Sequence, residues 1–67
     1  MKTKEAILAL KIGCKVRSPN WKQGEFIELE TDTGMCIDEC KLVHIHIDEI
    51  PLCYDPAQEW ELFNDNS

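Results

Sequence analysis

The first twelve residues carry the signals of one short helix. Thr3 is a good N-cap, and Glu5 suits the first helical turn. Residues 6–10 favour a helix, and Gly13 is placed to end it in the left-handed conformation. The pattern therefore predicts a helix over residues 4–12. Because its apolar run covers more than half of the circumference, we expect the helix to contact both the core and a second surface.

Beyond this helix, apolar and polar positions alternate with the period of strands. Residues 14–17 are the first expected strand, and Pro19 ends it because proline lacks an N–H group. A loop then runs to Gly24, and residues 25–31 alternate again. Asp32, Thr33 and Gly34 suit a hairpin connection. The later expected segments are a strand at 35–37, a turn at 38–41, a strand at 42–47, an irregular or edge segment between Pro51 and Pro56, and a last strand at 59–63.

The expected architecture is α+β, with one N-terminal helix packed on a four- to five-stranded antiparallel sheet. In this prediction Ile27, Leu29, Val43, Ile45 and Ile47 face inward, and Trp60 shares a face with Leu62. The 67 residues have room for one domain, which we assign to residues 1–63, followed by a polar tail at 64–67. A chain of this size buries only about 60% of the surface that it exposes when unfolded, so a partner surface would help it fold.

Charge is segregated along the chain, whose formal net charge is −6. Six basic residues and one acid occur through Lys22, whereas twelve acids and only Lys41 follow. Non-specific nucleic-acid binding is excluded by this balance, because it depends on counterion release by many Lys and Arg side chains. A small anion is still compatible with the basic stretch.

No stretch is apolar and long enough to span a bilayer, and no basic start precedes an apolar signal sequence, so we expect a cytoplasmic protein. Its four Cys are then reduced and act as small buried hydrophobes. A zinc site stays open as an alternative, since four possible ligands lie within eleven residues: Cys36, Cys40, His44 and His46. No Gly-rich phosphate loop or nucleophile with a nearby base is visible, so we expect no enzyme activity and no cofactor.

Two stretches resemble one known family. Residues 5–21 read EAILALKIGCKVRSPNW, and this order of helix, Gly stop, basic strand and Trp resembles the opening of the Thoeris anti-defence 2-like domain of phages and prophages. Residues 59–62, EWEL, resemble the acidic-Trp-Glu-hydrophobic ending of that family. Many family members are longer, with a Trp-Pro-Ser segment and an Asp-Leu-Leu-Ala run before the final Asp-Trp. Here residues 54–59 occupy that region, and Glu59 replaces the Asp.

The resemblance implies a phage anti-defence protein that acts in the host cytoplasm as a dimer or tetramer. Such a protein is a sponge for an immune signal. It binds a cyclic ADP-ribose isomer or a cyclic dinucleotide in pockets between subunits and does not turn it over.

A cyclic nucleotide signal requires donors for phosphate and an aromatic face for a base. The residues that we expect to provide them are Lys15, Arg17, Ser18, Asn20, Trp21 and Trp60. Both Trp residues are more typical of the core, or for Trp21 of an interface, than of a stacking surface, and Arg17 is also compatible with a carboxylate partner. A second function stays open, an acidic inhibitor that mimics nucleic acid and blocks a host or phage enzyme. Its charge would come from Glu25, Glu28, Glu30, Asp32, Asp38 and Glu39.

Overall fold

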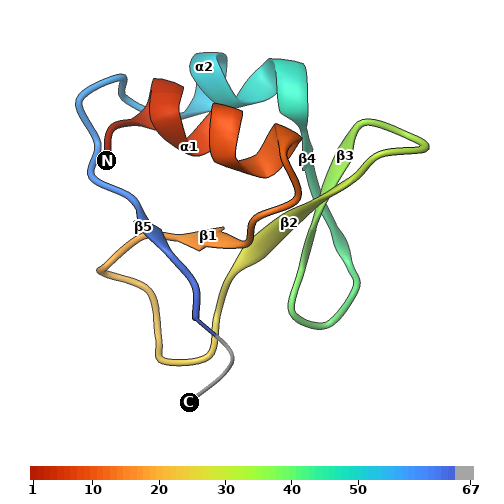
Figure 1. Cartoon of the computed structure of the whole chain (residues 1–67), viewed down its shortest axis with the longest axis horizontal. Coiled ribbons are helices and arrows are strands. Elements are labelled where there is room, and N and C mark those ends of the chain that lie inside the picture. Colours follow the sequence, from red (N-terminus) through yellow and green to blue (C-terminus); the bar gives the residue numbers. More distant parts are fainter. Residues whose placement is uncertain (65–67) are drawn as a thin grey trace.

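The computed structural model describes residues 1–64, which form a five-stranded antiparallel sheet with the strand order β4-β3-β2-β1-β5 (Figure 1). Helix α1 (Thr3–Lys11) packs on the sheet, and a short 3-10 helix, η1 (Ile47–Glu49), leads into α2 (Ile50–Cys53) beside it. The strands are β1 (Val16–Arg17), β2 (Ile27–Glu30), β3 (Met35–Asp38), β4 (Val43–His46) and β5 (Glu61–Leu62). The expected α+β architecture is confirmed.

Helix α1 begins one residue earlier than expected, and Lys2 takes the N-cap position in place of Thr3. The reason is that Thr3 is buried and its hydroxyl has other partners: Oγ1 donates to the carbonyl of Asp55 at 2.7 Å and accepts from Trp60 Nε1 at 2.9 Å. Gly13 follows the helix with φ +97°, as the sequence predicts. Hydrogen bonds thereby connect the start of α1 to Asp55 and Trp60, near the C-terminal end of the chain.

The core lies between the two helices and the sheet. Its buried members come from α1, from the first three strands, from η1 and α2, and from the approach to β5: Ala6, Ala9, Leu10, Val16, Ile27, Cys36, Ile47, Ile50 and Trp60. Ile27 and Ile47 are inward as expected, and Leu29 and Ile45 are half-buried against this core. Burial of these apolar side chains is the main force that holds the helices on the sheet.

The inward assignment of Val43 is wrong, and Leu62 does not share the burial of Trp60. Val43 is 65% exposed and Leu62 is 58% exposed. Both lie on the edge strands β4 and β5, and the pairing of β3 with β4 also shifts register between Cys36 and Ile37. Alternation assigns a residue to one face of a strand, but at a sheet edge that face is not covered by the helices.

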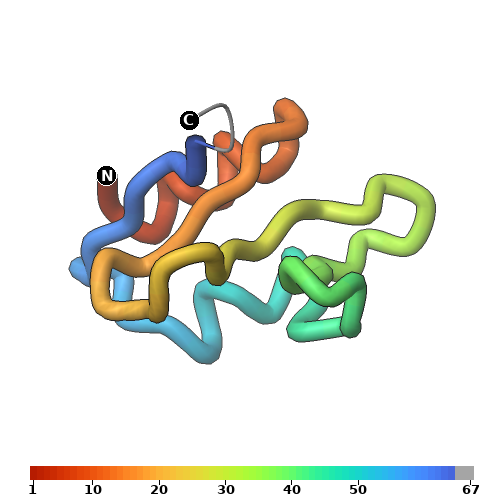
Figure 2. Tube along the Cα trace, turned by 90° about the horizontal axis from the view of Figure 1, so that it is seen from below, coloured from red at the N-terminus to blue at the C-terminus, as the bar shows by residue number. Residues whose placement is uncertain are grey.

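The segment expected to be irregular between Pro51 and Pro56 is helical in its first part, because α2 extends to Cys53. Pro51 lies in the first turn of α2, where a missing N–H costs no intrahelical hydrogen bond. The β2–β3 hairpin projects from the body of the molecule (Figure 2). Its Gly34 has φ +76°, and an added Cβ would lie 2.6 Å from His46 Nε2, so glycine is required there.

No helix among residues 1–64 is long and apolar enough to cross a membrane. Asn64 is the last described residue, so the rest of the expected polar tail, residues 65–67, lies outside the described part of the chain.

Candidate functional site

A cavity of about 330 Å³ opens between the loop after β1, the turn after β3 and the segment after α2. Four of its lining residues carry rings: Trp21, Phe26, His44 and Tyr54. Ile27, the buried first residue of β2, also lines it. Since a wall of this kind suits a flat ligand, we call this cavity the aromatic pocket.

Two rings of the aromatic pocket pack against the buried side chain of Trp60. The Trp60 ring contacts the rings of Trp21 and Tyr54 edge to face, with centroid distances of 5.7 Å and 5.1 Å. His44 Nε2 and the Tyr54 hydroxyl are hydrogen bonded at 2.8 Å, and the His44 ring lies 6.3 Å from that of Trp21. Burial raises the pKa of the Tyr54 hydroxyl above its ordinary value, which favours the neutral form. Trp60 therefore fixes the rings of Trp21 and Tyr54 on one side, while both residues still line the open pocket.

Three carboxylates complete the lining: Glu25, Asp38 and Glu39. Each accepts hydrogen bonds from backbone N–H groups, which fix its position. Glu25 accepts from Lys22 at 2.7 Å, Glu39 from Phe26 at 3.3 Å, and Asp38 from Cys40 and Leu42 at 2.9 and 3.0 Å. The eight described residues that line the pocket include neither Lys nor Arg. The aromatic pocket is thus a negatively charged site.

Arg17 organises the loop that carries Trp21. Its guanidinium donates to three backbone carbonyls of this loop, with Nε to Glu25 at 3.1 Å and Nη2 to Trp21 at 2.7 Å and to Lys22 at 3.1 Å. Nη1 pairs with the Glu61 carboxylate at 2.5 Å, and only 15% of the Arg17 side chain is exposed. Arg17 therefore positions the pocket wall and does not line the pocket.

The other predicted ligand residues are divided between the pocket and its surroundings. Trp21 is half-buried and lines it, and the Lys15 ammonium lies over the ring of Phe26, 4.9 Å from its centroid. Ser18 is buried, and its hydroxyl accepts from the backbone N–H of Asn20 at 3.2 Å. Asn20 is exposed and does not line the pocket, and Trp60 is only 2% exposed, so its ring presents no face to a ligand there.

Sequence reasoning missed three of the four rings that line the pocket. Phe26, His44 and Tyr54 are far apart in the chain, and only the folding of the sheet brings them to one place. The alternation of residues 42–47 does place His44 on one strand face, but that pattern alone gives no partner for it.

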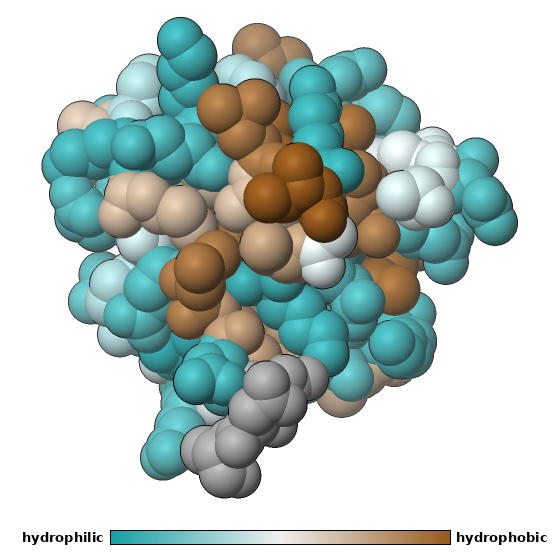
Figure 3. Space-filling model, in the orientation of Figure 1, coloured by the Kyte–Doolittle hydropathy of each residue, from teal (hydrophilic) through white to brown (hydrophobic). Residues whose placement is uncertain are grey.

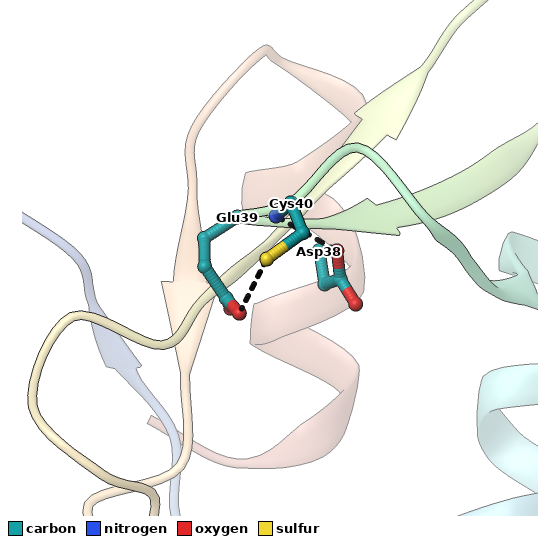
Figure 4. A group of neighbouring side chains, drawn as sticks. All are labelled: Asp38, Glu39 and Cys40. Atoms are coloured by element: carbon teal, nitrogen blue, oxygen red, sulfur yellow. Dashed lines mark hydrogen bonds between the residues drawn. The ribbon is translucent and has the colours of Figure 1, made fainter.

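The possible zinc ligands are not brought together. Cys36 is fully buried in the core, and burial raises the pKa of its thiol to about 11. Among residues 1–64, the one group close enough to share a metal ion is Asp38, Glu39 and Cys40 in the turn after β3 (Figure 4). Cys40 Sγ donates to the Glu39 carboxylate at 3.7 Å, and that charge raises the pKa of the exposed Cys40 thiol. These contacts make a turn stabilised by its own side chains.

Comparisons with models of protein families, with curated proteins and with solved structures found no match for this chain. The proposed function therefore rests on the geometry of the aromatic pocket.

Proposed function

We propose that the protein binds and sequesters a cyclic nucleotide signal, either a cyclic ADP-ribose isomer or a cyclic dinucleotide, without turning it over. The aromatic pocket carries this proposal, because Trp21 presents a half-buried ring to a cavity of about 330 Å³. Stacking of a base on such a ring contributes about 1–3 kcal/mol. The resemblance of residues 5–21 and 59–62 to the Thoeris anti-defence 2-like family supports the same function.

The size and charge of the pocket indicate how the bound nucleotide is oriented. Small-molecule sites have volumes of roughly 300–1,000 Å³, so this pocket fits one base and leaves the rest of the signal outside. Its carboxylates repel phosphate, so the phosphates lie beyond the rim. Lys15 contacts the pocket wall through Phe26 and is the predicted basic residue that is best placed to meet them.

In this proposal a second copy of the chain covers the outer part of the ligand. Apolar side chains on α1 and β5 support an assembly, because Leu8, Ile12 and Leu62 are 57%, 80% and 58% exposed. Figure 3 shows hydrophobic residues gathering over α1 on the face that is turned toward the viewer. Exposed apolar surface of this kind favours a symmetric contact between copies. Light scattering is expected to give a dimer or tetramer, and a 7.8 kDa monomer would contradict this part of the proposal.

Calorimetric titration with cyclic ADP-ribose isomers and cyclic dinucleotides tests the proposed function. The wild type is expected to bind at least one of them with saturation, and chromatography is expected to recover the ligand intact. Trp21→Ala removes the stacking ring, and Leu52→Ala, a change at a residue that is 84% exposed and outside the pocket lining, is the control. Binding that is absent with all of these ligands, or a hydrolysed product, would contradict the proposal.

One observation favours the alternative of an acidic inhibitor. The basic residues Lys2, Arg17 and Lys41 form ion pairs with carboxylates of the same chain, so fewer cations are left for an anionic ligand. An inhibitor of this class would give no signal with nucleotides and would compete with DNA for a basic nucleic-acid-binding protein. Glu30→Gln would weaken that competition, whereas it leaves nucleotide binding in the aromatic pocket unchanged.

A further inference from the structure

The aromatic pocket combines ring faces and carboxylates, and this pairing indicates which base it takes. We propose that the pocket selects a nucleotide whose base is positively charged, such as an adenine alkylated on a ring nitrogen, over a nucleotide with a neutral base. The inference rests on the proposed function and narrows its ligand class. It arises from Trp21 and Tyr54 on one side of the lining and from Asp38 and Glu39 on the other.

The rings favour a cation. A cationic group over the face of Trp or Tyr is attracted by the ring quadrupole, and Trp is the strongest of the aromatic side chains in this respect. The chain already contains one such contact, between the Lys15 ammonium and the ring of Phe26 at 4.9 Å. Edge-to-face contacts with Trp60 hold the rings of Trp21 and Tyr54 in place, so binding loses little conformational entropy in ordering them.

The carboxylates favour a cation independently of the rings. Glu25, Asp38 and Glu39 are each fixed by backbone N–H donors, and no Lys or Arg among the described lining residues neutralises them. A neutral base gains only hydrogen bonds from these groups, whereas a cationic base is attracted by three negative charges, against the single positive charge of Lys15 over the Phe26 ring. The phosphate of either nucleotide is repelled to the same extent, so the charge on the base decides the preference.

Two methylated nucleotides with the same heavy atoms, one with a cationic and one with a neutral base, test the effect of that charge. At pH 7 the ring of 1-methyladenosine 5′-monophosphate is cationic, whereas N6-methyladenosine 5′-monophosphate has the same atoms and phosphate and a neutral ring. Calorimetric titration is expected to show the cationic isomer binding about tenfold more tightly or better. Equal affinities, or a preference for the neutral isomer, would overturn the inference and leave the proposed function standing.

Charge-removing variants assign the preference to the pocket. Glu39→Gln keeps an oxygen to accept from Phe26 N–H but removes the charge, and Glu30→Gln is the matched control on the exposed hairpin, where a Gln oxygen still accepts from Thr33 Oγ1. Glu39→Gln is expected to reduce the preference for the cationic isomer several-fold, and the control to leave it unchanged. Should Glu39→Gln fail to fold, Glu25→Gln is the equivalent change.

The outcomes separate the two proposals. A preference that survives both pocket variants would overturn the inference, because the selectivity would then come from elsewhere. Cyclic nucleotides that bind while neither adenosine isomer does would also overturn it. Absence of binding by all cyclic nucleotides and both isomers would instead overturn the proposed function.

Discussion

The rings of Trp60 and Trp21 are neighbours in space, yet the two side chains differ in burial and in hydrogen bonding. Trp60 is 2% exposed, its Nε1 donates to Thr3 at 2.9 Å, and its backbone exchanges hydrogen bonds with Met1 at 2.7 and 2.9 Å. Trp21 is carried by a loop and lines an open pocket, with its ring centroid 5.7 Å from that of Trp60. One tryptophan closes the fold, and the other lines an open pocket.

In our proposal this difference divides the molecule into a scaffold around Trp60 and a binding surface around Trp21. The scaffold has its donors and acceptors paired within the chain, so changes there act on the free energy of unfolding. The binding surface has an open face, so changes there act mainly on affinity. Arg17 joins the two regions, since it holds the Trp21 loop against Glu61 of β5.

The largest effect is expected from Trp60→Ala. Removal of a fully buried aromatic side chain costs about 3–5 kcal/mol, which approaches the whole stability of a small domain. Trp60→Phe keeps much of the packing and loses the hydrogen bond to Thr3, so its cost is smaller. Urea unfolding followed by circular dichroism measures both. A Trp60→Ala chain as stable as the wild type would remove the distinction between the two regions.

Arg17→Ala is expected to affect both regions. Loss of charge-assisted hydrogen bonds to three loop carbonyls lowers the free energy of unfolding by about 1.5–3 kcal/mol and loosens the Trp21 loop. Arg17→Lys does not restore them, because an ammonium lacks the planar fork that reaches several acceptors. Hydrogen exchange at the amides of Trp21 and Glu25 reports the loosening. Unchanged exchange together with weaker nucleotide binding would show instead that Arg17 contacts the ligand directly.

Trp21→Ala is expected to change nucleotide affinity more than it changes the free energy of unfolding. We expect nucleotide affinity to fall by about ten- to a hundredfold, in line with the loss of one stacked base. The loss of unfolding free energy should be clearly smaller than for Trp60→Ala, since Trp21 is only half-buried. Calorimetry and urea unfolding on the same preparation separate the two effects. A stability loss equal to that of Trp60→Ala would make Trp21 a core residue.

The smallest effect concerns Glu59, beside Trp60. A hydrogen bond from Lys2 and the charge of Lys2 hold the pKa of the exposed Glu59 carboxyl below its ordinary value. A carboxyl whose pKa is lower in the folded state stabilises the fold above its unfolded pKa, and the contribution disappears as pH falls through the folded pKa. Glu59→Gln is therefore expected to lower the urea midpoint slightly at pH 7 and not at pH 2. An equal difference at both pH values would contradict the charge pairing.

Much of the fold could be predicted from the sequence, because alternation and Gly13 mark elements through local chemistry. The exposure of Val43 and Leu62 could not be predicted, since alternation does not show whether a layer covers an edge strand. Of the site, Trp21 could be predicted as one candidate ring. Tyr54 could not, since its place beside Trp60 depends on α2 and on contacts distant in the chain. A carboxylate partner was one of the expectations for Arg17, but its hydrogen bonds to three loop carbonyls depend on the path of the loop and could not be predicted.

The central claim is that the Trp21 side of the aromatic pocket holds a cyclic nucleotide intact. The most direct measurement purifies wild type and Trp21→Ala from cells that make such signals, heats each protein and identifies the released molecules by mass spectrometry. We expect an unmodified cyclic nucleotide from the wild type and little or none from Trp21→Ala. Equal amounts from both proteins, a linear product, or no nucleotide from the wild type would contradict it.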